Sequence, residues 1–163
     1  MKSLVEIEAR MRAGVLSETG FLGKNEKLVD DLERDAKTVA KMGLSYEDLA
    51  SGLEQLILSA LNSENRMVNT GKYLVKLKVF TGFQICPWTK DIHHSQCQEG
   101  GGVKYASIDW WIRNNITGQE LSGPGLIVHL IRAHRFFEGF ESPYRVDPEK
   151  LAILLGLRAS KEK

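Results

Sequence analysis

Cysteine is scarce in this sequence, because its 163 residues include only two, Cys86 and Cys97. A small secreted domain stapled by disulfides would need more, so we expect no disulfide framework. The opening residues mix charged and apolar side chains without a continuous apolar core, which predicts no export signal. No apolar run approaches the roughly 20 residues that cross a bilayer. We therefore expect a cytoplasmic protein with no membrane partner.

An excess of either charge is also missing, since 22 basic and 21 acidic residues leave a formal net charge of +1. No overall field therefore favours nucleic acid or an anionic lipid surface. The charges are unevenly divided, with 12 acids and 8 bases in residues 1–65 against 9 acids and 14 bases in residues 66–163. The two parts could attract each other, or the basic part could face an anionic partner, or both could be ordinary solvated surfaces.

A glycine-rich phosphate loop is absent as well. The run Gly100-Gly101-Gly102 lacks the lysine and the helix start that such a loop requires, so we interpret it as a flexible connection. The remaining composition, 42% hydrophobic and 26% charged, is typical of a globular protein.

Residues 1–63 are predicted to be helical. A helix from about Asn25 to Met42 carries an apolar stripe at spacings of three and four, and Gly43 stands where a C-terminal glycine cap belongs. Ser45 can cap a further helix that reaches the polar segment 62–65. The short link predicts a helical hairpin. This segment could dock on the rest of the chain or pair with its copy in a homodimer.

Residues 64–163 are predicted to form an α+β domain. Alternating patterns predict strands at 73–80 and 105–113, and turn residues at 114–118 suggest a hairpin to a further strand at 119–121. Helices are expected at 125–137, capped by Ser122, and at 149–155, where Asp147-Pro148 opens the helix. The predicted fold is therefore an N-terminal helical hairpin followed by a small antiparallel sheet packed with two C-terminal helices.

Two cysteines and two histidines suggest a metal centre. Cys86 and Cys97 border the long loop after the first strand, and His129 and His134 lie on the helix at 125–137. Two sulfur and two imidazole ligands are the set of a tetrahedral structural zinc site. Both histidines border the apolar stripe of their helix, so each could equally be a core-edge histidine that bonds a backbone carbonyl.

The spacing of these residues supports a zinc site only in part. Ten residues separate Cys86 from Cys97, which is more than the two to four of a typical finger. His129 and His134 are five positions apart, about 140° of rotation and about 7.5 Å of rise on a regular helix. Joint binding of one ion would require the helix to loosen near its C-terminus. Four intervening residues nevertheless fall within the range found in zinc fingers.

Other ligand sets would imply other chemistry. An alternative set is Cys86, His94 and Cys97 with one helix histidine. Three protein ligands from it and a bound water would make a catalytic zinc site of the kind found in metal-dependent hydrolases. Asp109 could then serve as base or as an orienting partner. Cys86 could also be a nucleophile with a histidine base in a metal-free protein, although no local motif supports this.

Two further features could bind ligands. Arg145 lies in the loop at 142–148 and could hold a phosphate or carboxylate, or could bond helix-end carbonyls or Asp147. One of Trp110 and Trp111 must face away from the core, because neighbours on a strand point to opposite faces, and it could stack on a ring. Together these observations predict a zinc-binding, non-catalytic module that engages protein or nucleic acid. A metal-dependent hydrolase and a metal-free structural or interaction protein remain the alternatives.

Overall fold

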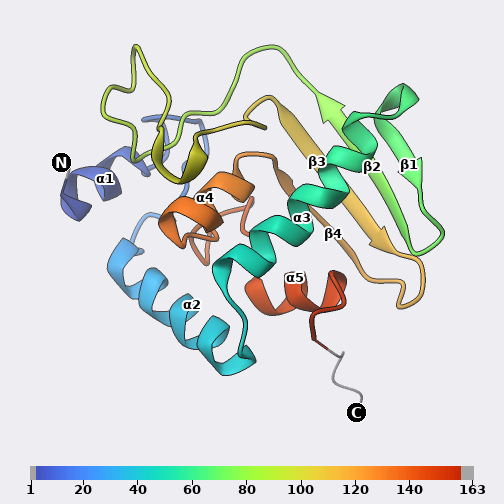
Figure 1. The fold of residues 1–163 in the computed structure, drawn as a ribbon. Coiled ribbons are helices and arrows are strands. Elements are labelled where there is room, and N and C mark those ends of the chain that lie inside the picture. Colours follow the sequence, from blue (N-terminus) through green and yellow to red (C-terminus); the bar gives the residue numbers. More distant parts are fainter. Residues whose placement is uncertain (1–2, 159–163) are drawn as a thin grey trace.

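The computed structural model describes residues 3–158 and confirms an α+β fold with an antiparallel sheet (Figure 1). The helices are α1 (Leu4–Arg10), α2 (Leu28–Met42), α3 (Tyr46–Leu61), α4 (Ile127–His134) and α5 (Pro148–Leu154). The strands are β1 (Met67–Asn69), β2 (Tyr73–Val79), β3 (Ile108–Asn114) and β4 (Glu120–Pro124). Two short 3-10 helices, η1 (Glu64–Arg66) and η2 (Glu99–Gly101), lie between them.

The link between α2 and α3 has the predicted caps. Gly43 ends α2 in the left-handed conformation, with φ of 71°. Ser45 begins α3 with a capping box, in which its hydroxyl accepts from the Asp48 backbone N–H and the Asp48 carboxylate accepts from the Ser45 N–H. The two helices have different main neighbours, since α3 packs chiefly on α4 and β2, whereas α2 packs chiefly on α5.

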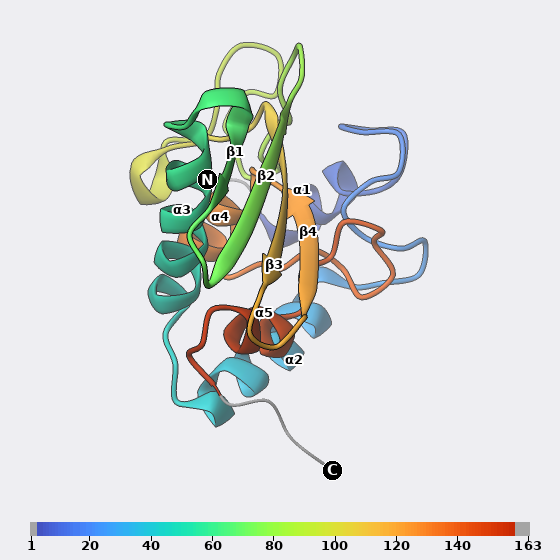
Figure 2. The ribbon, with the colours of Figure 1, turned by 90° about the vertical axis from the view of Figure 1, so that its right-hand side faces the viewer.

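The sheet has the order β1-β2-β3-β4, and every neighbouring pair is antiparallel. Its strands alternate in burial, and Val75, Trp110 and Ile112 face the helices. Figures 1 and 2 show α3 and α4 on one side of the sheet. Trp111 points to the other side, where the Lys76 amine lies 5.1 Å from its ring centre. Strand β1 arises in a segment for which the sequence predicted no strand.

Both ends of α4 differ from the prediction. Ser122 does not cap this helix, because it lies in β4 and pairs with Trp111. The helix ends at His134 rather than Phe137, because Arg135 adopts the left-handed conformation with φ of 59°. The Phe136 N–H then bonds the Leu130 carbonyl, which closes the helix end as glycine usually does.

One apolar core joins the two halves of the chain. Buried side chains of α3, such as Leu53 and Ile57, belong to the same cluster as Trp110 of β3 and Leu130 of α4. The connection between β2 and β3, residues 80–107, is called the β2–β3 loop below, and it lies over α4 (Figure 1). Within residues 3–158, no helix combines the length and apolar character needed to cross a membrane.

Candidate metal centre

The side chains of Cys86, Cys97, His129 and His134 meet between the β2–β3 loop and α4. Each residue offers one candidate ligand atom, and these four atoms all lie within 4.8 Å of one another. Both sulfurs are buried, at 0% and 4% exposure, and the His134 side chain is 4% exposed. The structure therefore assembles a buried Cys2His2 cluster that could hold a metal ion, from the four residues chosen as ligands in the sequence.

The two histidines converge without any loosening of the helix before His134. His134 is the last residue of α4, and its ring centre lies 5.0 Å from that of His129, at an interplanar angle of 78°. The chain leaves the helix at Arg135, and η2 of the β2–β3 loop packs against α4. The Trp88 ring of the β2–β3 loop stacks on the His134 ring, with centroids 4.2 Å apart.

One interatomic distance in the cluster matches tetrahedral zinc. The Cys97 sulfur lies 3.5 Å from His134 Nε2. With zinc–sulfur bonds of about 2.3 Å and zinc–nitrogen bonds of about 2.0–2.1 Å, a tetrahedral angle separates these two ligand atoms by about 3.5 Å. The sulfur and the nitrogen can therefore bind one ion without rearrangement.

An acceptor oxygen lies near Nδ1 of each imidazole. His129 Nδ1 lies 3.2 Å from the Gly102 carbonyl, and His134 Nδ1 lies 3.5 Å from a Glu99 carboxylate oxygen. His129 Nε2 is buried with no hydrogen-bond partner, although buried nitrogens normally have one. Metal-binding histidines typically show this arrangement, with an acceptor on one nitrogen and the metal on the other.

Glu99 and Gly102 contact the two histidines, and the sequence analysis did not identify either position. Both reach the histidines through the fold of the β2–β3 loop, across 27 or more positions in the chain. The only local signal is an acidic residue two positions after Cys97, and such a pattern is too common in sequences to indicate a role.

Burial shifts the pKa values of the four candidate ligand side chains. Desolvation lowers the pKa of His134 to about 3, and it also lowers the pKa of His129, so both imidazoles are neutral and keep a lone pair. Desolvation raises the pKa of the Cys86 and Cys97 thiols, against backbone hydrogen bonds from Trp88 and Glu99 that favour the thiolates. A divalent cation would supply the positive charge that buried thiolates need.

Contacts outside the cluster also hold the β2–β3 loop. The Arg10 guanidinium of α1 donates to the Pro87 and Thr89 carbonyls at 2.8 and 2.6 Å. The Gln96 side-chain amide donates to the Gln84 carbonyl at 2.8 Å. These bonds bring the two cysteine-bearing parts of the loop together and fix them against α1.

Gly100 allows the β2–β3 loop to approach α4. Its φ is +60°, and a Cβ at this position would lie 2.8 Å from the Ala133 Cβ. We expect Gly100→Ala to lower the free energy of unfolding by about 1–3 kcal/mol and to weaken metal binding, since the loop must move off the helix. Urea unfolding and metal titration would measure both effects.

Gly101 provides the matched control for this substitution. It also has positive φ, +92°, but a Cβ there meets nothing within 4 Å. Gly101→Ala therefore introduces backbone strain without the clash, and it should leave metal affinity close to that of the wild type. Equal metal affinities for the two variants would contradict a role for close loop–helix approach.

Comparison with family models, with curated proteins and with solved structures found no match to this chain. The candidate function therefore depends on the residues themselves.

Two of the additional candidate residues lie apart from the cluster. The His94 side chain is 81% exposed and bonds the Asp91 carboxylate at 2.8 Å. Asp109 is exposed on β3 and pairs in register with Lys78, on the sheet face that the helices leave open. Neither belongs to the four-residue group whose ligand atoms converge.

Arg145 occupies a buried structural environment. Its guanidinium donates to both carboxylate oxygens of Asp35, at 2.7 and 2.9 Å, and to the Glu138 carbonyl at 2.9 Å. It also lies 3.7 Å from the centre of the Phe140 ring. This bonding corresponds to the structural alternative for Arg145, in which its donors bind groups of the protein.

The buried carboxyl of Glu138 should make stability depend on pH. Burial raises the pKa of Glu138 to about 8 from 4.5, while the Ser142 hydroxyl donates to it and opposes the shift. Because the folded pKa exceeds the unfolded one, the folded state retains a proton that the unfolded chain releases between pH 4.5 and 8. Stability contributed by this group is complete below that window and is lost as pH rises through it.

Glu138→Gln should remove this dependence. We expect the variant to gain roughly 2–4 kcal/mol over the wild type at pH 8 and less than about 1 kcal/mol at pH 5, as measured by urea unfolding at both values. Glu33→Gln, an exposed change on α2, is the control and should show no such difference. A gain that is equal at both pH values would argue against a protonated Glu138.

Proposed function

We propose that this chain is a zinc-binding, non-catalytic interaction module, with Cys86, Cys97, His129 and His134 as the four ligands. The convergence of these four buried ligand atoms within 4.8 Å supports the proposal most directly. Two thiolates and two neutral imidazoles in tetrahedral reach of one another favour zinc over the hard cations, which prefer oxygen ligands. The free Nε2 of His129 supplies a ligand that is otherwise unpaired.

The ligand count supports a structural role for the ion. Four protein ligands complete a tetrahedral shell, whereas a catalytic zinc keeps one position open for water or substrate. A hydrolase would also need a base beside the ion, and the two residues considered for that role, His94 and Asp109, lie outside the cluster. We therefore favour the structural role over the hydrolase.

The ion would organise a surface for a partner. Apart from η2, the β2–β3 loop contains no helix or strand, so few backbone bonds of its own stabilise it. A metal shared between this loop and α4 would fix the loop at two points, Cys86 and Cys97. A rigid loop on a packed scaffold is a frequent setting for binding residues.

Elemental analysis of the purified protein tests the proposal. We expect close to one zinc per chain, and red-region visible absorption typical of tetrahedral thiolate coordination after replacement by cobalt. His134→Ala should lose most of the metal, whereas His94→Ala, which changes an exposed histidine outside the cluster, should retain it. If the protein binds no zinc even after reconstitution from the reduced apo form, the proposal is wrong.

A further inference from the structure

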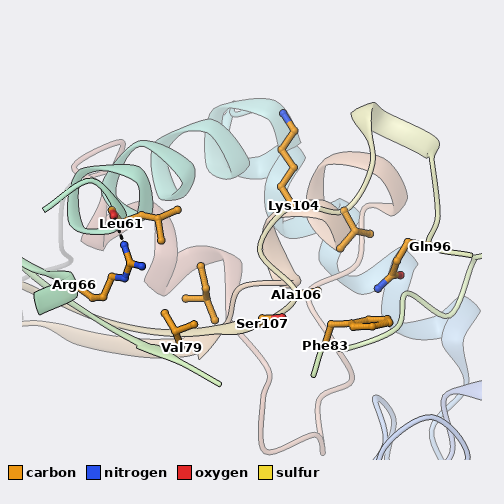
Figure 3. A pocket seen from close by; sticks show the side chains of 10 residues that line it. Leu61, Arg66, Val79, Phe83, Gln96, Lys104, Ala106 and Ser107 are labelled. Atoms are coloured by element: carbon orange, nitrogen blue, oxygen red, sulfur yellow. Dashed lines mark hydrogen bonds between the residues drawn. The ribbon is translucent and has the colours of Figure 1, made fainter. Parts of the chain in front are cut away.

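An open cavity of about 350 Å³ lies between the end of α3, the end of β2 and the β2–β3 loop. Its lining is mostly apolar, from Leu61, Val79, Phe83, Val103, Ala106 and Ile108. We call it the Phe83 cavity. Figure 3 shows Val79, Ser107 and Phe83 along one side of it, with Arg66 beside Leu61 at one end. This volume is large enough for one large apolar side chain of a bound molecule, together with the groups next to it.

Apolar side chains at this cavity are left in water. Phe83 is 61% exposed and Val79 is 51% exposed. Single exposed apolar residues are ordinary, but an aromatic ring and an aliphatic side chain that border one apolar hollow make a patch of the kind that binds partners.

The charged groups in the lining have one sign. Arg66 and Lys104 are both cations, and none of the described residues that line the cavity is acidic. The Arg66 guanidinium donates to the Leu61 carbonyl at 2.7 Å, which holds it beside the cavity (Figure 3). The nearby carboxylate of Glu54 interacts electrostatically with Lys104, but it is already bonded to Arg132 and Tyr105. The cavity therefore offers positive charge to an acidic partner.

The backbone at Arg66 is held in an uncommon conformation. Asn65 and Arg66 have φ of 58° and 53°, in the left-handed region that non-glycine residues other than asparagine and aspartate rarely occupy. Strain of this kind persists only where the surroundings impose it, and it gathers at binding sites. Here the conformation accompanies the bond that turns the Arg66 side chain back toward Leu61.

We propose that the Phe83 cavity binds an acidic peptide segment of a protein partner, which inserts an aliphatic or aromatic side chain between Phe83 and Val79. This inference rests on the proposed zinc centre, because the loop that carries both cysteines also supplies Val103 and Lys104 to the cavity wall. Aliphatic walls and only two lining cations favour a peptide over a nucleic acid, whose binding uses stacked bases and many phosphate contacts.

A displayed library of random peptides, selected on the full-length zinc-loaded protein, tests the proposal. We expect enriched peptides that combine acidic residues with a large apolar residue. A fluorescent copy of the consensus should then bind about tenfold more weakly to Phe83→Ala and to Arg66→Glu. Ile116→Ala, an exposed apolar change on the β3–β4 turn, and Lys37→Glu on α2 are the matched controls and should leave affinity within about twofold.

Each other result overturns the proposal. Absence of enrichment, a basic consensus, or preferred binding of a single-stranded oligonucleotide would each exclude an acidic peptide. A dimer in sedimentation that Phe83→Ala dissociates would instead assign the cavity to a second copy of the chain. Zinc content and melting temperature are measured on every variant, so a failure of the cavity is distinguished from a failure of the metal centre. Chelation should abolish peptide binding along with the zinc.

Discussion

Cys97→Ser should lower the melting temperature of the zinc-loaded protein by about 10–20 °C. Structural zinc sites contribute about 10–16 kcal/mol of apparent binding free energy that is coupled to folding. Replacing one ligand should remove about 5 kcal/mol or more of this, and each kcal/mol shifts the midpoint by about 2–4 °C in a chain of this size. Differential scanning calorimetry at fixed free zinc would measure the shift.

A chelator provides the internal control for this experiment. Removal of zinc from the wild type should reproduce the loss seen in Cys97→Ser, and the chelator should have little further effect on the variant, because both act through one ion. Ser95→Ala, in the same loop but with no ligand atom in the cluster, should keep the chelator response of the wild type. A wild-type midpoint that does not move on chelation would rule out a structural ion.

Arg145→Met should destabilise the fold by about 3–5 kcal/mol without loss of metal. The substitution leaves the Asp35 carboxylate, at 4% side-chain exposure, without the two bonds of 2.7 and 2.9 Å that it accepts. Removing one partner of a buried ion pair is costly because the remaining charge stays desolvated. Urea unfolding gives the loss, and elemental analysis confirms that the zinc remains.

The pair can be tested by restoring its balance. Asp35→Leu combined with Arg145→Met should recover a large part of the loss, since no buried charge is left unpaired. Arg158→Met, which breaks the more exposed pair with Glu149, is the matched control and should cost less than about 1 kcal/mol. If Arg145 instead served an external anion, added phosphate would stabilise the wild type and not Arg145→Met.

The helix caps show how much of the fold is local. Three helix ends are set by one residue each. Gly43 is a left-handed C-cap, Ser45 begins a capping box, and Asp147 is an N-cap that accepts from the Lys150 N–H. These ends were predicted because short-range bonding decides them. The end of α4 was not predicted, because Arg135 adopts the left-handed conformation at a position where the sequence has no glycine.

The residues of the candidate metal cluster could be predicted from the sequence, whereas the way in which they come together could not. Sulfur and imidazole chemistry indicated Cys86, Cys97, His129 and His134, and the structure brings the four together. The spacing argued against them, because a regular helix separates the two histidines by about 140°. Both histidines do lie on α4, which ends at His134, and their side chains nevertheless converge, with ring centres 5.0 Å apart.

By itself the sequence determined the fold class, most helix caps and the identity of the candidate metal ligands, because those depend on near neighbours and on the chemistry of single side chains. Tertiary structure alone decided that Glu99 and Gly102 contact the imidazoles, that Arg145 is buried against Asp35, and that Phe83 borders an open cavity. Each of these contacts joins positions brought together by chain packing, and no local pattern encodes such a meeting.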